Sequence, residues 1–248
     1  MEEPVRINKY LSQCGVCSRR EADRMVEKGR ILVNGKIPQM GTMVTGKDTI
    51  IVDGKVVSGR SEEIVIAFHK PAGVVCTTSK KDPKNIIDFI HFPERIFPVG
   101  RLDKDSTGLI LLTNNGQLMD DILRGRNAHE KEYQVTVDHP VKDSIWDAME
   151  QGVPILDTIT RPCRIPYRNG KEFHIIITQG LNRQIRRMCE YFGYRVRKLK
   201  RVRIMNIKLG DLPEGKWRYL TEQELTDLKK MCAEVHVEKE MRKEPENG

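Results

Sequence analysis

The stretch that most constrains this chain is a charged turn that runs directly into an apolar segment. Residues 100–113 read Gly-Arg-Leu-Asp-Lys-Asp-Ser-Thr-Gly-Leu-Ile-Leu-Leu-Thr, so Asp103 and Asp105 stand just before the apolar run. Carboxylates occur here where a chain normally needs only a polar loop, and loops are where functional side chains concentrate. The stretch is therefore the first candidate for a functional site.

Length and composition limit what surrounds this stretch. The chain has 248 residues and is 38% hydrophobic, which is enough for one large domain and a small one. No run approaches the roughly 18 apolar residues of a membrane-spanning helix, and the acidic first residues differ from those of a signal peptide. The 6 cysteines are scattered, unlike a disulfide framework. We therefore expect a cytoplasmic protein with free thiols and no membrane partner.

Basic residues outnumber acidic ones. Lys and Arg total 43 against 35 Asp and Glu, which gives a formal net charge of +8 and a pI near 9.2. This balance favours a polyanionic partner, above all nucleic acid, over a small neutral substrate. On charge alone, a solvated surface that happens to be basic is an equally good alternative.

The first sixty residues predict a compact unit of two helices and two hairpins. Apolar residues between positions 7 and 14 recur at helical spacing. Ser18-Arg19-Arg20-Glu21 is a capping box for a second helix. Asn34-Gly35 and Asp53-Gly54 are sequences of tight hairpin turns, because both turn positions favour positive φ.

A linker-like stretch near residue 62 separates this unit from a larger one. Beyond it, strand-like segments at 64–68, 133–137 and 173–178 alternate with helical segments at 145–150 and 184–192. Thr221-Glu222-Gln223-Glu224 caps a last helix, and the residues after it have the charged composition of a disordered segment. We therefore expect an α+β chain with domains at 1–62 and 63–234 and a disordered tail at 235–248.

Two further segments contain candidate site residues. His129-Glu130-Lys131-Glu132-Tyr133 is a polar turn that enters a strand, and residues 179–188 form a Gly-containing turn followed by a helix. From Arg183 to Arg203, nine basic residues meet one acidic residue, which predicts a phosphate-binding surface. By propensity alone, Tyr133 would be an ordinary packing residue and an arginine on the helix would be structural.

These motifs resemble those of a known enzyme family. Residues 100–113, the His-Glu-Lys-Glu-Tyr segment and Gln-Gly-Leu-Asn-Arg-Gln-Ile-Arg-Arg-Met resemble the signatures of RNA pseudouridine synthases, in the RsuA-like branch and closest to its RluF-type members. Residues 5–60 resemble an S4 RNA-binding domain. The resemblance implies a small S4 domain and a catalytic domain built on a mixed, mostly antiparallel β-sheet with flanking helices. It also implies conversion of uridine to pseudouridine in large-subunit (23S) ribosomal RNA, without a cofactor.

The resemblance also implies roles for individual residues. Asp103 is then the catalytic carboxylate, which either adds to the sugar C1′ or takes a proton from the sugar, and both roles need an ionised group in a site that excludes water. Arg101 takes the place of the flipped base in the RNA stem, Tyr133 stacks on the target uracil, and Arg186 pairs with the aspartate. Further RNA contacts are expected from Arg6, Lys9, Arg19, Arg20, Asn34, Lys36, Lys70, Arg183 and Arg187.

Other interpretations of the same residues remain open. Asp103 and Asp105 form an Asp-x-Asp pattern that a metal-dependent glycosyltransferase would use, but no His or third acidic ligand lies nearby in the sequence. Cys14-x-x-Cys17 lacks the second ligand pair of a zinc knuckle, so we expect no metal. A non-catalytic S4 RNA-binding or ribosome-assembly factor would explain the charge but not the acidic pair. A tRNA stem-loop is an additional or alternative substrate, and the sequence is compatible with a monomer.

Overall fold

The chain divides into two compact units. The computed structural model describes residues 3–57, 59, 62–79, 81–123 and 128–241. The first unit consists mainly of residues up to Glu63, and the second begins at Ile64. Two short segments, 93–95 and 114–116, group with the first unit. Part of the linker-like stretch, at positions 58 and 60–61, lies outside the described residues.

The smaller unit packs two short helices against short antiparallel strands. Its elements are β1 (Val5–Arg6), α1 (Ile7–Gln13), α2 (Arg19–Glu27), β2 (Ile31–Val33), β3 (Met43–Val44), β4 (Ile50–Val52) and β5 (Lys55–Val56). Buried side chains of both helices, such as Leu11 and Ala22, share one core with Ile31 of β2. The Ser18 hydroxyl accepts a hydrogen bond from the Glu21 amide at 3.1 Å, which confirms the predicted N-cap of α2.

The two predicted turns differ in what they connect. Asp53-Gly54, with both residues at positive φ, joins β4 to β5 as the sequence predicts. Asn34-Gly35 also forms a positive-φ turn, but only Val33 and Lys36 pair across it. The strand partner of β2 is β4, so the second strand expected after Asn34-Gly35 was wrong. Pro38 follows almost at once, and proline has no amide to donate to a strand ladder.

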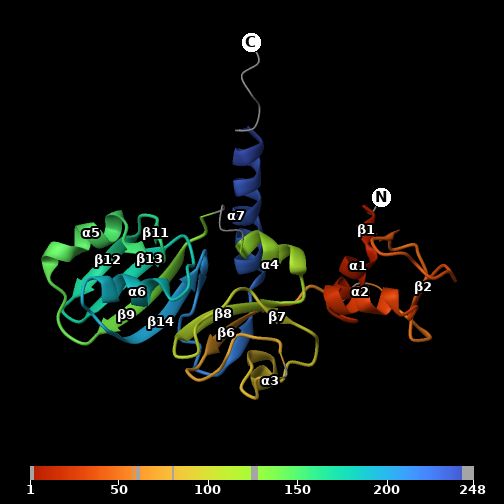
Figure 1. Ribbon diagram of the computed structural model, residues 1–248, viewed down its shortest axis with the longest axis horizontal. Helices are drawn as coiled ribbons and strands as arrows, with labels where there is room; N and C mark the ends of the chain where they lie inside the picture. The colour runs from red at the N-terminus through yellow and green to blue at the C-terminus, as the bar shows by residue number, and fades with distance from the viewer. Residues whose placement is uncertain (1–2, 58, 60–61, 80, 124–127, 242–248) are drawn as a thin grey trace, which may run out of the picture. The chain divides into compact units, whose positions relative to one another are not determined.

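The larger unit is built on one mixed sheet of nine strands within the described residues (Figure 1). The main path runs β12-β13-β9-β14-β8-β6-β16, with β15 beside β14 and β7 beside β8. Only the pairing of β14 with β8 is parallel among those described, which confirms the expected mixed, mostly antiparallel sheet. The strands of this sheet are β6 (Val65–Lys70), β7 (Phe97–Pro98), β8 (Thr107–Thr113), β9 (Lys131–Val137), β12 (Arg164–Asn169), β13 (Glu172–Ile177), β14 (Val196–Ile204), β15 (Ile207–Lys208) and β16 (Trp217–Tyr219). Two further strands, β10 (Pro154–Ile155) and β11 (Thr158–Ile159), pair with each other outside the sheet.

Helices cover both faces of this sheet. They are α3 (Ile86–Ile90), α4 (Gly116–Leu123), α5 (Trp146–Gln151) with the preceding 3₁₀ turn η2 (Asp143–Ile145), α6 (Gln184–Tyr191) and α7 (Glu222–Met241). Trp146 of α5 and Met188 of α6 belong to one core, whereas Ile122 of α4 and Leu228 of α7 belong to another. The predicted α+β class and the helices predicted at 145–150 and 184–192 are confirmed. Among the described helices, none is both long and apolar enough to cross a membrane.

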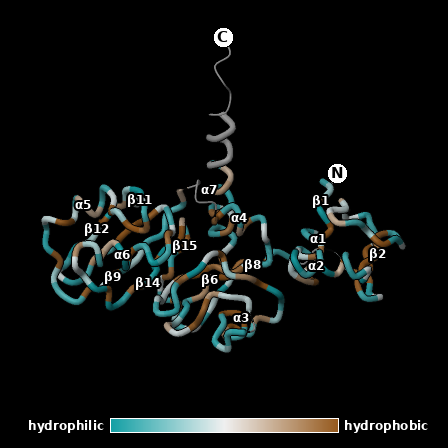
Figure 2. The backbone as a smooth tube through the Cα atoms, in the orientation of Figure 1, coloured by the Kyte–Doolittle hydropathy of each residue, from teal (hydrophilic) through white to brown (hydrophobic). Residues whose placement is uncertain are grey.

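The neighbouring strands β6 and β8 separate the two cores. Alternate residues of a strand face opposite sides of a sheet, and here Ile66 and Ile110 enter one core while Ala67 and Leu111 enter the other. All of β6 and the last six residues of β8 are buried. Because both faces of these strands are buried, their apolar residues do not alternate with polar ones. Figure 2 colours the backbone of both strands by residue hydropathy.

The last helix is longer than the sequence analysis predicts. Its capping box is complete, with 3.1 Å from the Glu224 amide to the Thr221 hydroxyl and 2.9 Å from the Thr221 amide to the Glu224 carboxylate. Helix α7 then continues past the expected domain end at residue 234 to Met241. The expected disorder of the tail at 235–248 stays a prediction. Residues 242–248 lie outside the described residues.

Lys70 lies in the protein interior, although the sequence analysis assigned it to RNA. Its side chain is fully buried, and its ammonium donates to the backbone oxygens of Pro71, Val74 and Lys104 at 2.7, 2.9 and 3.2 Å. Burial lowers the pKa of this lysine below its ordinary value. The RNA contact was therefore wrong: three carbonyl oxygens replace the water or phosphate that a surface lysine would bind. The ammonium ties the 71–74 turn to the loop of Asp103.

We expect Lys70→Met to destabilise the larger unit strongly. The change leaves buried carbonyl oxygens without a donor, and each such group costs about 1–3 kcal/mol. The free energy of unfolding, measured by urea denaturation, should therefore fall by roughly 3 kcal/mol. Lys104→Met removes the same charge from an exposed side chain and should change it by less than about 0.5 kcal/mol. Equal small effects of the two substitutions would contradict a structural role for the buried ammonium.

Candidate active site

The loop of Asp103 is tied to the segment that follows β6. The Gly73 amide donates to the Lys104 oxygen at 2.8 Å, and the Leu102 amide lies 3.4 Å from the Cys76 sulfur. The buried strand β8 begins only a few residues later, so both ends of the loop are held. A carboxylate on such a loop keeps one position more precisely than one on a free surface loop.

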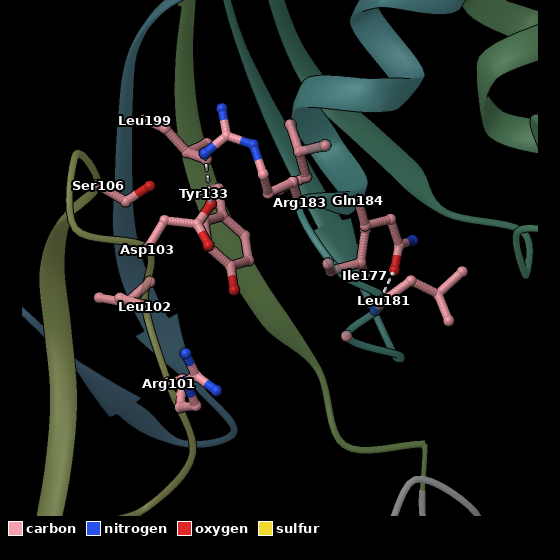
Figure 3. Close-up of a pocket in the computed structure, with 12 residues that line it drawn as sticks. Arg101, Leu102, Asp103, Ser106, Tyr133, Ile177, Leu181, Arg183, Gln184 and Leu199 are labelled. Atoms are coloured by element: carbon pink, nitrogen blue, oxygen red, sulfur yellow. Dashed lines mark hydrogen bonds and ion pairs between the residues drawn. The ribbon is translucent and has the colours of Figure 1, made fainter. Parts of the chain in front are cut away.

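Two arginines at the start of α6 approach the Asp103 carboxylate, and Figure 3 shows one of them, Arg183. The Asp103 Oδ2 lies 3.8 Å from Arg183 Nη1 and 3.9 Å from Arg186 Nε. The Arg183 side chain is 42% exposed, whereas that of Arg186 is 10% exposed. Arg186 also donates to the Val196 oxygen at 3.3 Å and the Ser106 hydroxyl at 3.4 Å. The structure therefore brings the aspartate together with one partly open and one buried guanidinium group.

The aspartate lines a small cavity of about 100 Å³, here named the Asp103 cavity. Figure 3 shows the Tyr133 ring beside the Asp103 carboxylate, with Ile177 and Leu181 on another side of the same space. Arg101 is exposed and also lines the cavity. An aromatic ring and apolar side chains around one carboxylate suit a flat, partly polar ring as the ligand.

Tyr133 is held by Arg201, a buried arginine that the sequence analysis included only in the basic run of residues 183–203. Arg201 is 3% exposed, its Nε donates to the Leu109 oxygen at 2.7 Å, and its Nη1 lies 3.5 Å from the Tyr133 hydroxyl. The guanidinium carbon is 6.0 Å from the centre of the Tyr133 ring. A Cβ on Gly108 would lie 2.2 Å from the Arg201 backbone oxygen, so only glycine permits this approach of β14 to β8. That glycine is the one sequence signal of the contact.

The basic run of residues 183–203 is not a single phosphate-binding surface. Arg201 is buried, and Arg203 forms salt bridges with Glu130 at 3.0 Å and Glu132 at 2.9 Å. The prediction was wrong for these residues because the run folds into α6 and β14, whose inward sides take up part of the charge. Exposed basic residues remain at Arg183, Arg195, Arg197 and Lys198.

The other predicted RNA contacts differ in accessibility. Arg187 lies away from the Asp103 cavity and donates to two oxygens of Asn182 at 3.1 and 3.4 Å. In the smaller unit, the Asn34 amide donates to Asp48 at 2.8 Å and its oxygen accepts a backbone hydrogen bond, so this side chain shapes its own turn. The remaining candidates in that unit are the half-buried Lys9 and the exposed Arg6, Arg19, Arg20 and Lys36.

Metal ligation was considered for two pairs of residues in the sequence. Within the described part of the chain, no three His, Cys, Asp or Glu side chains gather as a metal site. Cys14 and Cys17 are both partly buried thiols of the smaller unit. The Asp-x-Asp pair of residues 103 and 105 has no third such side chain beside it among the described residues.

Comparison with known proteins assigns both units. Residues 64–191 match the family described as RNA pseudouridylate synthase, and residues 5–50 match the S4 domain. The chain belongs to the RNA pseudouridine synthase family. As a pseudouridine synthase it isomerises uridine in RNA, so RNA is its partner.

Curated relatives and a solved structure cover nearly the whole chain. The dual-specificity RNA pseudouridine synthase RluF of Salmonella typhi is 52% identical, covering 91% of this chain and 79% of the relative. Its counterpart in Escherichia coli strain K12 is 50% identical, covering 93% of this chain and 80% of the relative. Ribosomal large subunit pseudouridine synthase B of Bacillus subtilis is 34% identical, covering 92% and 96%. A crystal structure of a pseudouridylate synthase shares 27% identity with a TM-score of 0.67, covering 90% of this chain and 99% of that one. The resemblance to RluF-type synthases and the S4-plus-catalytic fold are confirmed.

Lys131 is a second basic residue near this site, and the sequence analysis named it only as part of the polar turn before Tyr133. It lies at the start of β9, and its ammonium donates to the His129 oxygen at 3.2 Å. Burial, followed by repulsion from Arg201, lowers the pKa of Lys131 to about 8. This lysine therefore changes charge close to neutral pH.

RNA affinity should fall as the pH rises from about 7 to 9. Over this range Lys131, with a pKa of about 8, loses its positive charge, while ordinary lysines with pKa near 10.4 keep theirs. In Lys131→Met, affinity should be lower at neutral pH and less sensitive to pH. Fluorescence anisotropy with a large-subunit rRNA fragment at constant ionic strength measures both effects. Lys198→Met, at an exposed position, should keep the wild-type pH slope. The same slope in wild type and Lys131→Met would disprove the role of this lysine.

Proposed function

We propose that this synthase modifies a uridine in large-subunit (23S) ribosomal RNA and that Asp103 is its catalytic carboxylate. One observation supports the choice of Asp103 most strongly. The Asp103 carboxylate faces a cavity that it shares with Tyr133, and it lies within 4 Å of Arg183 and Arg186. Asp105, two residues later, is exposed and lines no part of that cavity.

The reaction exchanges one bond of the target nucleotide for another. The bond from N1 to C1′ breaks, the uracil turns, and C5 joins C1′. C5 loses its proton and N1 ends with one, so the atoms balance without a co-reactant. An ionised carboxylate at the sugar serves this chemistry either by adding to C1′ or by removing a sugar proton. In both cases Arg183 and Arg186 attract the carboxylate into one position.

The detached uracil has to stay in the site while it turns. We assign this task to Tyr133, whose ring lies beside the aspartate in the cavity (Figure 3). Base stacking on an aromatic side chain contributes about 1–3 kcal/mol, which offsets part of the cost of taking the base out of the helix. To Arg101, which is exposed and lines the same cavity, we assign the entry into the space that the base leaves.

The smaller unit adds RNA contacts that are separate from the chemistry. Its exposed Arg6, Arg19, Arg20 and Lys36 are suited to phosphate groups. Because both units belong to one chain, binding by one raises the effective concentration of RNA for the other. Structured RNA is recognised largely by shape, and the RluF relatives are called dual-specificity enzymes. We therefore include a tRNA stem-loop as a second substrate. Separately, we propose that the active form is a monomer.

Tritium release gives the direct test. Large-subunit rRNA labelled with tritium at uracil C5 should lose label to water when incubated with the wild-type protein, because C5 exchanges its hydrogen for C1′. Asp103→Asn keeps the size of the side chain but removes its charge, and release should fall by at least about 10³-fold. EDTA should not reduce release by the wild type.

Asp105→Asn is the matched control, since it makes the same change two residues away on the same loop. It should retain RNA binding and release within about threefold of wild type. An equal loss of tritium release in both variants would contradict the assignment of Asp103 as the catalytic residue. No release from rRNA or tRNA, with binding intact, would disprove the proposed substrate. Primer extension after carbodiimide treatment, on rRNA and tRNA separately, then maps the modified position and decides between one substrate and two.

A further inference from the structure

A second cavity adjoins the Asp103 cavity on the other side of Tyr133. It measures about 400 Å³, against about 100 Å³ for the Asp103 cavity. Arg101, Tyr133 and Gly180 line both cavities, so the two adjoin at these residues. Its volume falls within the range of about 300–1,000 Å³ that is typical of ligand sites. We name it the Lys131 cavity, after the lysine that lines it but not the smaller one.

The Lys131 cavity carries positive charge without a compensating carboxylate. Among the described residues, its lining contains Arg101, Lys131 and Arg201 and no Asp or Glu. Arg201 is 3% exposed, and its Nη2 has no hydrogen-bond partner among the described residues. The side-chain nitrogen of Gln179, which also lines the cavity, is likewise buried and unpartnered there. Buried donors without acceptors are costly, so this lining is built for a ligand that brings acceptor atoms.

The rest of the lining is apolar. Val99, Ile122, Leu123 and Ile204 come from the Asp103 loop segment, α4 and the end of β14. An inorganic anion would use the charges but leave this wall unfilled. A nucleobase has a flat face for the apolar wall and ring or carbonyl acceptors at its edge for Arg201 and Lys131. The combination therefore favours a base over a bare phosphate.

We propose that the Lys131 cavity binds a second unstacked nucleotide of the same RNA, adjacent to the target uridine, through its base. The inference rests on the proposed function, because a target uracil in the Asp103 cavity would place a flanking nucleotide next to Arg101 and Tyr133. The second base recovers part of the unstacking cost and selects targets whose neighbour is free to leave the helix. Tyr133 lines both cavities, so filling one also restrains the ring that holds the target base.

A double-mutant cycle between protein and RNA tests this subsite. The RNA is a synthetic stem-loop that carries the mapped target, with an abasic sugar at each flanking position in turn. The protein variant is Leu123→Trp, which fills the cavity from a side chain that is 40% exposed. Leu156→Trp makes the same change at a 43% exposed position that lines neither cavity. Affinity is measured by fluorescence anisotropy with Asp103→Asn in every protein, so that turnover does not interfere.

One abasic position should weaken binding about tenfold with the parent protein and with Leu156→Trp, but less than about twofold with Leu123→Trp. Leu123→Trp should itself bind the intact RNA about tenfold more weakly. If every abasic position costs the same in all three proteins, the subsite does not exist. If Leu123→Trp proves unfolded by circular dichroism, Lys131→Met takes its place and should show the same coupling.

A separate measurement tests the alternative that the Lys131 cavity binds a backbone phosphate. If a phosphate binds there, the loss of affinity caused by a neutral methylphosphonate at the flanking position would be smaller in Lys131→Met than in the parent protein. The loss caused by the abasic sugar would then be the same in the parent protein and in both variants. That outcome would overturn the base in favour of a backbone phosphate. Tritium release by the wild-type protein is scored separately. Its absence would disprove the proposed reaction, whereas normal release without coupling would disprove only the second nucleotide.

Discussion

A buried ammonium ion links the first strand of the larger unit to the loop that carries Asp103. Lys70 ends β6, and its three carbonyl partners lie on the turn after that strand and on the Asp103 loop. No side chain of ordinary polarity would satisfy three converging carbonyl oxygens, because only an ammonium offers three donors from one atom. The aspartate can therefore meet the arginines of α6 at a defined distance only while this charge stays buried.

The same geometry depends on the way two strands meet. β14 runs parallel to β8 only at residues 200–201, where Gly108 leaves room for its backbone. On its other side β14 pairs with β9, where Arg201 and Tyr133 are direct cross-strand partners, so their side chains meet. The site is thus assembled from a loop, a helix start and two strands that are far apart in the chain. Each residue is supported by a rigid element, as an exact catalytic distance requires.

Arginine and lysine have two different tasks in this protein. Some of them build the site: Lys70, Arg186 and Arg201 are buried, and Arg203 is paired with Glu130 and Glu132. Others are exposed and available to phosphate groups, among them Arg19, Arg20 and Arg197. A net charge of +8 describes the sum of both sets, so it indicates a polyanionic partner without showing where that partner binds. Replacing the buried set should affect the fold or the chemistry, and replacing the exposed set should affect the salt dependence of binding.

Local pattern determined the parts of this protein that depend on neighbours in the sequence. The caps at Ser18 and Thr221, the helices near 145–150 and 184–192, and the family motifs around Asp103 and Tyr133 all follow from the order of residues alone. Which charges are buried depended instead on the folded chain, because burial follows from strand order and from the packing of distant segments. Lys70 and Arg201 look like surface residues in the sequence, but Lys70 donates to three backbone oxygens and Arg201 to one, and a local pattern specifies none of them. The cavity beside Tyr133 was invisible for the same reason: its walls come from five segments that meet only in the folded chain.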